Sequence, residues 1–130
     1  MKILKARVCG YCMGVRRAME RTIAVAGEKE EGYSVYTMGP LIHNASALEN
    51  LAKLGVSALD EAALPPSLDR ATVVIRAHGV PPELSEALSS RGARVVDATC
   101  PRVRLSQKRA SDYAAKGYTV FLAERRIMAK

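Results

Sequence analysis

Apolar residues recur along the chain in two patterns, one typical of amphipathic helices and one typical of buried strands. Residues 71–77 form a largely β-branched run without polar alternation, which is typical of a strand in a parallel sheet covered on both faces. Residues 13–31 instead carry an apolar residue every three or four positions, which is the spacing of one helical face. We therefore predict a buried strand over 71–77 and a helix over 13–31, with Gly32 just past the end of the helix.

The same two patterns continue through the rest of the chain. Further strands are predicted over residues 3–8, 34–38, 56–59, 94–97 and 118–123, and further helices over residues 45–54, 81–90 and 101–116. Asn44 is suited to cap the second helix, and Pro101 is suited to the first turn of the last one. Strands that alternate with helices indicate βαβ units. We therefore predict an α/β fold, built as a parallel-sheet α/β/α domain.

The order of these elements also predicts the domain organisation. Residues 1–98 are expected to form a first α/β domain that carries most of the strand-to-helix turns. Residues 99–130 are expected to be the truncated start of a second, similar domain. This expectation follows because the chain stops just after a strand that should lead into another helix.

Each of the four strand-to-helix turns carries one residue suited to ligand binding. These residues are Cys12, His43, His78 and Cys100. In an open parallel sheet such turns lie along one edge, where ligands bind, so we expect the two thiols and the two imidazoles to converge. Thiolates select zinc, copper or iron–sulfur centres, and imidazole can bind a metal or donate a proton.

Composition narrows the possible classes of protein. The chain has 130 residues, of which 48% are hydrophobic and 25% charged, as in an ordinary globular domain. No apolar run reaches the ~18–20 residues that cross a bilayer, and charges interrupt the N-terminus where a signal peptide would be apolar. We therefore predict a cytoplasmic protein without a membrane partner. Three cysteines are too few for a disulfide scaffold.

The net charge of +7 is concentrated in the first and last helical stretches. Such a field could attract a phosphate-bearing substrate, a nucleic acid or an acidic protein, although solvated helix faces account for most of these charges. The chain has five tyrosines and one phenylalanine, so stacking platforms for single-stranded nucleic acid are scarce. We predict no nucleic-acid partner.

Cys9 and Cys12 form a C-x-x-C pair that allows several interpretations. The pair could be half of a zinc site or a dithiol redox motif, or Cys9 could simply pack as a small hydrophobic residue, which we favour. Cys12 differs because it lies between Gly10 and Gly14 at a helix N-terminus, which favours the thiolate form. An anion held nearby would also account for Arg16 and Arg17 in the first turn of that helix.

The other three candidate residues also have structural alternatives. Cys100 could be a ligand at a helix start or buried packing. His43 and His78 could be solvated loop residues, or they could hydrogen-bond or pair with a phosphate. Asn44 could contact a ligand or cap a helix. Neither a dinucleotide fingerprint nor a P-loop is present.

The four turns together resemble the motifs of one enzyme family. GYCMGVRRA at residues 10–18 resembles the opening motif of the 4-hydroxy-3-methylbut-2-enyl diphosphate reductases, which end the methylerythritol phosphate route to isoprenoids. GPLIHN at 39–44 and RAHGVPP at 76–82 resemble the two histidine motifs of these enzymes, and VDATCP at 96–101 resembles their second cysteine motif. Motif order and spacing agree over roughly residues 1–123.

This resemblance implies an oxidoreductase with a 4Fe–4S cluster held by three cysteine thiolates, with one iron left open for substrate. Cys12 and Cys100 match two ligand positions, and Cys9 matches none. His43 and His78 match positions that contact the diphosphate of the substrate. The implied reaction removes an allylic hydroxyl with two electrons and two protons and yields isopentenyl and dimethylallyl diphosphate. The implied partners are the allylic diphosphate and an electron donor such as ferredoxin or flavodoxin.

The family's pattern continues beyond the residues of this chain. Its members add a histidine, a glutamate that supplies protons, a third cysteine ligand, and hydroxyl and amide side chains, none of which is matched here. Glu124 does not match the proton donor, because no His-Pro-Glu motif surrounds it. We therefore expect a fragment that is inactive alone, with no catalytic proton donor. A small basic module that binds zinc or nucleic acid, and a dithiol oxidoreductase using Cys9 and Cys12, are the alternatives.

Overall fold

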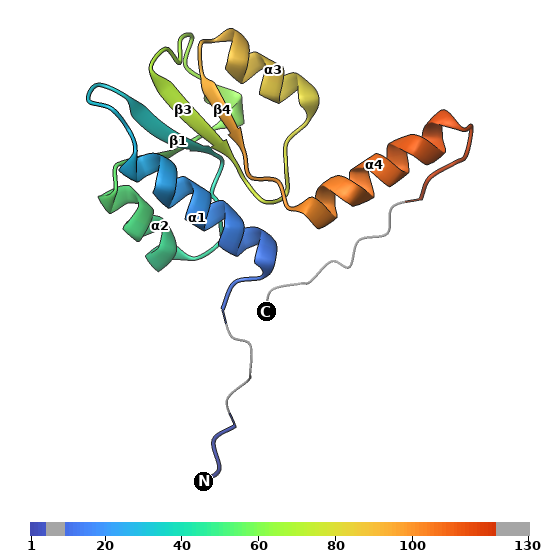
Figure 1. Ribbon diagram of the computed structural model, residues 1–130, viewed down its shortest axis with the longest axis horizontal. Helices are drawn as coiled ribbons and strands as arrows, with labels where there is room; N and C mark the ends of the chain where they lie inside the picture. Colours follow the sequence, from blue (N-terminus) through green and yellow to red (C-terminus); the bar gives the residue numbers. More distant parts are fainter. Residues whose placement is uncertain (5–9, 122–130) are drawn as a thin grey trace.

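The computed structural model describes residues 1–4 and 10–121 (Figure 1). The described residues form helices, strands and one short 3-10 helix in the order α1 (Met13–Gly27), β1 (Ser34–Met38), α2 (Ala45–Lys53), β2 (Val56–Leu59), η1 (Glu61–Ala63), β3 (Ala71–Ile75), α3 (Pro82–Ser90), β4 (Arg94–Asp97) and α4 (Pro101–Ala115). Strands alternate with helices as predicted, and the predicted α/β fold class is confirmed.

The strands form one parallel sheet in the order β2-β1-β3-β4. β3 is buried at all five of its residues, as its unbroken apolar run predicts. β1 and β3 pair along their whole length, so that Met38 lies opposite Ile75 where both strands end. The connection after β1 leads through α2 to β2 on one side, and the connection after β3 leads through α3 to β4 on the other. The carboxyl ends of β1 and β3 are therefore the topological switch point of the sheet, where such folds bind ligands.

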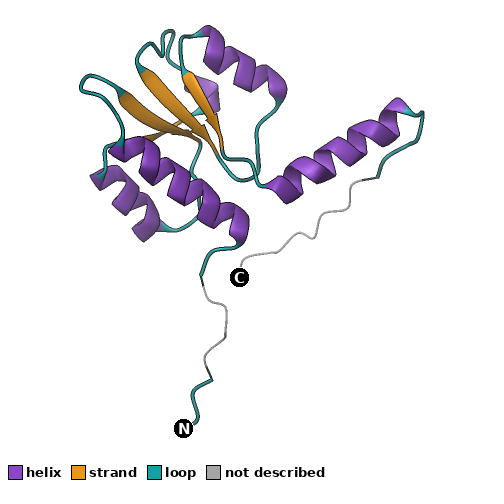
Figure 2. Ribbon diagram, viewed as in Figure 1, coloured by secondary structure: helices purple, strands orange, loops and turns teal. Residues whose placement is uncertain are grey.

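Helices cover both faces of the sheet, as Figure 2 shows. α1 and α2 pack on one face, where residues such as Ala18 and Leu51 join Val74 in one core cluster. α3 packs on the other face, where Leu84 and Leu88 join Val73 in a second cluster. The sheet is therefore packed on both faces. Each of the four candidate residues lies in a segment that adjoins one of these helices or strands.

Several predicted boundaries differ from the structure. α1 ends at Gly27 instead of residue 31: the bond from the amide of Glu28 to the carbonyl of Ala24 is its last helical bond, and the next backbone bond, from Tyr33 to Glu30, belongs to a turn. The predicted stop, Gly32, lies in the turn that leads into β1. Asn44 does cap α2, since its side chain accepts a hydrogen bond of 2.9 Å from the amide of Ala47. This bond decides between the two roles considered for Asn44 in favour of the cap.

The predicted first and last strands fall partly outside the described residues. Residues 3 and 4 are not in a strand, and the remainder of the segment 3–8 is not described. Residues 118–121 are not in a strand either, and residues 122 and 123 lie outside the described part. Cys9 and Glu124 also lie outside it, so the packing proposed for Cys9 stays a prediction.

α4 differs from the other helices because it projects away from the layered body (Figure 1). None of the residues of α4 is buried, and the side chain of Leu105 is half exposed. The division of the chain at residues 98 and 99 stays a prediction. Within the residues that the structure describes, no helix has both the length and the apolar character needed to span a bilayer.

Candidate functional site

The turn that carries Cys100 is tightly bonded to the end of β3. The backbone amide of Cys100 donates a 2.9 Å hydrogen bond to the carbonyl of Ala77. One residue earlier, the amide of Thr99 donates a 2.7 Å bond to the carboxylate of Asp97. Cys100 is the N-cap residue of α4, and its side chain makes no capping hydrogen bond. The thiol is therefore left without a capping role at the start of a helix.

Gly14 brings the first turn of α1 directly against Cys100. A Cβ atom at Gly14 would lie 2.8 Å from the Cβ and 2.9 Å from the Sγ of Cys100, closer than two such atoms can pack. Only glycine permits this approach. Cys12 is the N-cap of the same helix, two residues before Gly14, and it too makes no side-chain capping bond. The structure thus places the turn of Cys12 beside the turn of Cys100, which is the arrangement expected from the sheet edge.

The two cysteines differ in exposure. Cys12 is exposed and Cys100 is half-buried, and neither forms a disulfide. The pair therefore keeps two thiols available, one facing solvent and one partly enclosed by α1 and the end of β3.

Two arginines of α1 hold the Cys100 turn from the side. Arg21 donates a 2.9 Å hydrogen bond to the carbonyl of Asp97, and Arg17 lies 3.4 Å from the carbonyl of Thr99. The sequence suggested that a bound anion accounts for Arg17 in the first turn of α1. The structure gives Arg17 a different partner, the polar backbone of a neighbouring turn.

Asp97 is the anionic centre of this turn. Burial alone would raise the pKa of its carboxyl group, but hydrogen bonds from Thr99 and the positive charge of Arg104 outweigh burial and hold the pKa below its ordinary value. Arg104 forms an ion pair with the same carboxylate from the first turn of α4. Asp97 therefore stays ionised and ties the end of β4 to the start of α4.

His78 lies in a tight turn that adjoins the Cys100 turn. The amide of Gly79 donates a 3.0 Å bond to the carbonyl of Arg76 and closes the turn around the histidine. Gly79 has a φ of +78°, and a Cβ there would lie 3.3 Å from the side chain of Thr99. His78 itself is exposed. The structure therefore brings the His78 turn and the cysteine turns to one place.

His43 reaches the same edge by way of β1. It is exposed and immediately precedes the capping residue Asn44. Its loop leaves the sheet at Met38, which is paired with Ile75 at the start of the loop that carries His78. The two histidine loops thus begin side by side.

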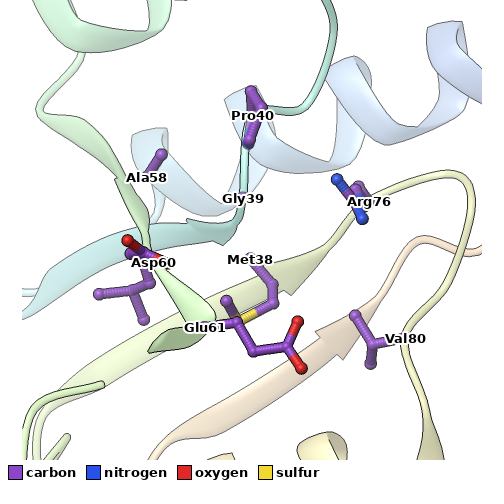
Figure 3. A pocket seen from close by; sticks show the side chains of 9 residues that line it. Met38, Gly39, Pro40, Ala58, Asp60, Glu61, Arg76 and Val80 are labelled. Carbon is purple, nitrogen blue, oxygen red and sulfur yellow. The ribbon is translucent and has the colours of Figure 1, made fainter. Parts of the chain in front are cut away.

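A cavity of about 350 Å³ opens at the switch point (Figure 3), and neither His43 nor His78 lines it. Its lining includes Gly39, Asp60, Glu61, Val80 and Arg76. The Nε atom of Arg76 is buried and has no hydrogen-bond partner among the described residues. Arg76 had no predicted role. The sequence signal that could have found it is an arginine placed directly after a largely apolar strand, where a solvated surface residue is unexpected.

Within the described residues, no group of three or more histidine, cysteine, aspartate or glutamate side chains is arranged to hold a metal ion. The two cysteines therefore do not form a complete site with other residues of this part of the chain.

Comparison with known proteins identifies the family. The LytB protein family model matches residues 3–126. The chain belongs to the LytB family. Its resemblance to the 4-hydroxy-3-methylbut-2-enyl diphosphate reductases is thereby confirmed.

LytB relatives of this chain carry that reductase name. The 4-hydroxy-3-methylbut-2-enyl diphosphate reductase of Treponema pallidum (strain Nichols) is 45% identical over 137 aligned positions, which cover 93% of this chain and 36% of the relative. The enzyme of the same name from Treponema denticola is 39% identical, with 96% of this chain and 44% of the relative covered. The chain thus spans well under half the length of these relatives.

Solved LytB structures share the fold. A structure of (E)-4-hydroxy-3-methyl-but-2-enyl diphosphate reductase, described as the terminal enzyme of the non-mevalonate pathway, matches with a TM-score of 0.73 and 38% identity. The match covers 84% of this chain and 37% of that one. The reductase of Plasmodium falciparum matches with a TM-score of 0.71 and 25% identity, over 84% of this chain and 33% of its own.

Proposed function

We propose that the chain provides the N-terminal part of the cluster and substrate site of a 4-hydroxy-3-methylbut-2-enyl diphosphate reductase. The observation that carries this proposal is the contact of Gly14 with Cys100, which joins the two cysteine turns of a LytB chain. In this proposal Cys12 and Cys100 are two of three thiolate ligands of a 4Fe–4S cluster, and the third ligand and the proton-donating glutamate lie outside this sequence.

The residues present fit such a cluster in part. Thiolates are the usual ligands of iron–sulfur clusters, and both cysteines are free N-cap residues whose side chains make no capping hydrogen bond. When bound, the cluster would supply an open iron as a Lewis acid and a store of electrons. Two thiolates do not complete its coordination, so the chain alone should hold it weakly.

The histidine turns have a separate role in this proposal. His43 and His78 are exposed at the same edge as the cysteines, and imidazole can donate a hydrogen bond to a phosphate oxygen. We assign them to the diphosphate of the allylic substrate, which they would anchor while its hydroxyl faces the cysteines. In the overall reaction the C–O bond breaks and the hydroxyl leaves as water with one proton. The carbon skeleton takes up two electrons and the other proton.

The proposal also includes an electron donor and a cellular location. The reaction consumes two electrons, so an electron donor such as ferredoxin or flavodoxin is required. A cytoplasmic location is part of the proposal.

Anaerobic reconstitution with iron and sulfide tests the ligand assignment. Cys12→Ser and Cys100→Ser should each remove most of the iron and acid-labile sulfide that the chain retains, because each removes one of two thiolates. Cys9→Ser is the matched control and should retain as much as the unchanged chain. The chain should show no turnover of the allylic diphosphate.

Other results would contradict the proposal in different ways. Robust turnover by the chain alone would show that its site is complete. Thiol–disulfide exchange activity that depends equally on Cys9 and Cys12 would favour the dithiol oxidoreductase. Tight zinc binding, or nucleic-acid binding with a steep dependence on salt, would favour the small basic module.

A further inference from the structure

Arg76 touches both histidine loops, once through its backbone and once through its side chain. Its carbonyl accepts the 3.0 Å hydrogen bond from Gly79 that closes the turn around His78. Its guanidinium group lies over Gly39, the first residue of the loop that carries His43. A Cβ at Gly39 would lie 3.3 Å from Nη1 and 3.9 Å from Cζ of Arg76.

Gly39 is itself held firmly, so the contact has a fixed geometry. Its amide donates a 3.0 Å bond to the carbonyl of Leu59, and its carbonyl accepts a 2.9 Å bond from the hydroxyl of Thr37. Its φ is +68°, a conformation that glycine adopts without strain. The absent side chain leaves the space beside which the guanidinium lies, and Figure 3 labels both residues among those that line the cavity.

The charge of Arg76 is not used for pairing within the described residues. No ion pair joins Arg76 to Asp60 or Glu61 there, although both line the same cavity. Its buried Nε atom has no partner in that part of the chain either. A buried donor without a partner costs stability, so this side chain is not explained by a stabilising hydrogen bond at Nε. Arg76 directly follows β3, and its guanidinium reaches Gly39, which directly follows β1. This position allows it to set the spacing between the two loops.

We propose that Arg76 is a positioning residue that sets the spacing between the His43 and His78 loops and so prepares them for one diphosphate group. This inference rests on the proposed function, because it assumes that the two histidines bind the same anion. Arg76 acts through the two loops, without contacting the diphosphate.

The binding of inorganic diphosphate to the full chain tests this inference, by calorimetry or by amide NMR shifts. Arg76→Met should weaken binding about tenfold, and Arg76→Lys should restore it only in part, because a lysine ammonium lacks the flat shape that lies over Gly39. Arg94→Met is the matched control. It removes the same charge from an exposed position at the start of β4, at the opposite edge of the sheet, and should leave binding unchanged.

A double-mutant cycle separates positioning from direct contact. If Arg76 acts through the His43 loop, the double variant Arg76→Met with His43→Ala should bind diphosphate as well as the single variant that binds it less tightly. Multiplicative losses would show an independent contact and would overturn the inference. Binding unchanged by Arg76→Met, or reduced equally by Arg94→Met, would overturn it as well.

Two further measurements keep the result decisive. If His43→Ala and His78→Ala bind diphosphate as well as the unchanged chain, the proposed function fails, whatever Arg76 does. If the unchanged chain binds no diphosphate, the amide NMR shifts of the ligand-free chain and of its Arg76→Met variant are compared instead. Arg76→Met should then move the amides of both histidine loops, and movement of one loop only would overturn the inference. If the methionine variant does not fold, binding by Arg76→Lys at full strength would overturn it.

Discussion

The Cys12 and Cys100 turns have the same local design but differ in how the fold supports them. Each cysteine is the N-cap of a 15-residue helix, and neither caps it with its side chain. The Cys100 turn is bonded to Ala77, to Asp97 and to arginines of α1. The Cys12 turn is exposed, and its one backbone bond in the described residues is the helical bond from Arg16.

This difference shows how a rigid turn can position a less supported one. The Cys100 turn is fixed by the sheet, and the contact at Gly14 then places the start of α1 against it. Arg17 and Arg21 bond to the same turn, and Ala18 packs on the sheet, so these contacts and the close approach at Gly14 together set the position of Cys12. A substitution at Gly14 should therefore lower the free energy of unfolding more than a substitution at either cysteine.

The largest effect is expected from Gly14→Ala. The new Cβ would collide with Cys100 at under 3.0 Å, and the cost should be about 1–3 kcal/mol of unfolding free energy, as for other overpacked sites. Gly27→Ala is the matched control in the same helix, because a Cβ there meets nothing within 4 Å. It should be neutral or stabilising by up to about 1 kcal/mol. Urea unfolding measures both, and equal effects would show that the contact is not tight.

The second effect is a difference in thiol reactivity. Cys12 is exposed and Cys100 half-buried, so iodoacetamide should modify Cys12 about ten times faster, which corresponds to about 1.4 kcal/mol in accessibility. Peptide mapping by mass spectrometry follows each site separately. In Gly14→Ala the rate at Cys100 should rise toward that of Cys12. Equal rates in the unchanged chain would contradict the proposed enclosure of Cys100 by α1.

A smaller effect is expected from Asp97→Asn. The change weakens the bond from Thr99 and removes the ion pair with Arg104. One such hydrogen bond is worth about 1 kcal/mol, and the exposed ion pair adds little. Thermal unfolding should show this loss, and the reactivity of Cys100 should rise while that of Cys12 stays the same. Arg94→Met serves again as a control for altered surface charge.

The smallest effect is the response of the Cys100 turn to acid. The pKa of Asp97 is lower in the folded chain than its ordinary value, so the unfolded state binds more protons in that range. The stabilisation is therefore present above the ordinary carboxyl pKa and is lost as the pH falls through the lower folded value. An NMR titration of the Thr99 amide should report this loss. In Asp97→Asn the acid response of that amide should disappear.

Much of the fold follows from local patterns that the sequence displays. The strands at 34–38, 56–59 and 94–97 match the structure residue for residue, because short apolar runs bounded by turn residues are strong local signals. The end of α1 was misplaced because the residues after Gly27 are compatible with a helix. The structure shows the end, because the last helical bond is that of Glu28 and the next backbone bond, from Tyr33 to Glu30, belongs to a turn.

The candidate site was predicted as a set of residues gathered at one edge of the sheet, but the particular contacts between their turns were not predicted. The family motifs pointed to Cys12, Cys100, His43 and His78, while the roles proposed for them stay predictions. Arg76 received no role, because its significance lies in the approach of its guanidinium to Gly39, 37 positions earlier in the chain.

By itself, the sequence determined the kinds of element, their order and the residues placed at each strand-to-helix turn, because helical and strand periodicity are local properties of a chain. The tertiary structure alone decided which turns touch. The strand order β2-β1-β3-β4 places the end of β1 beside the end of β3, and the bond from Arg21 to Asp97 spans 76 positions. Such contacts depend on how the sheet is assembled and on where a missing side chain lets two segments meet, and no local pattern records either.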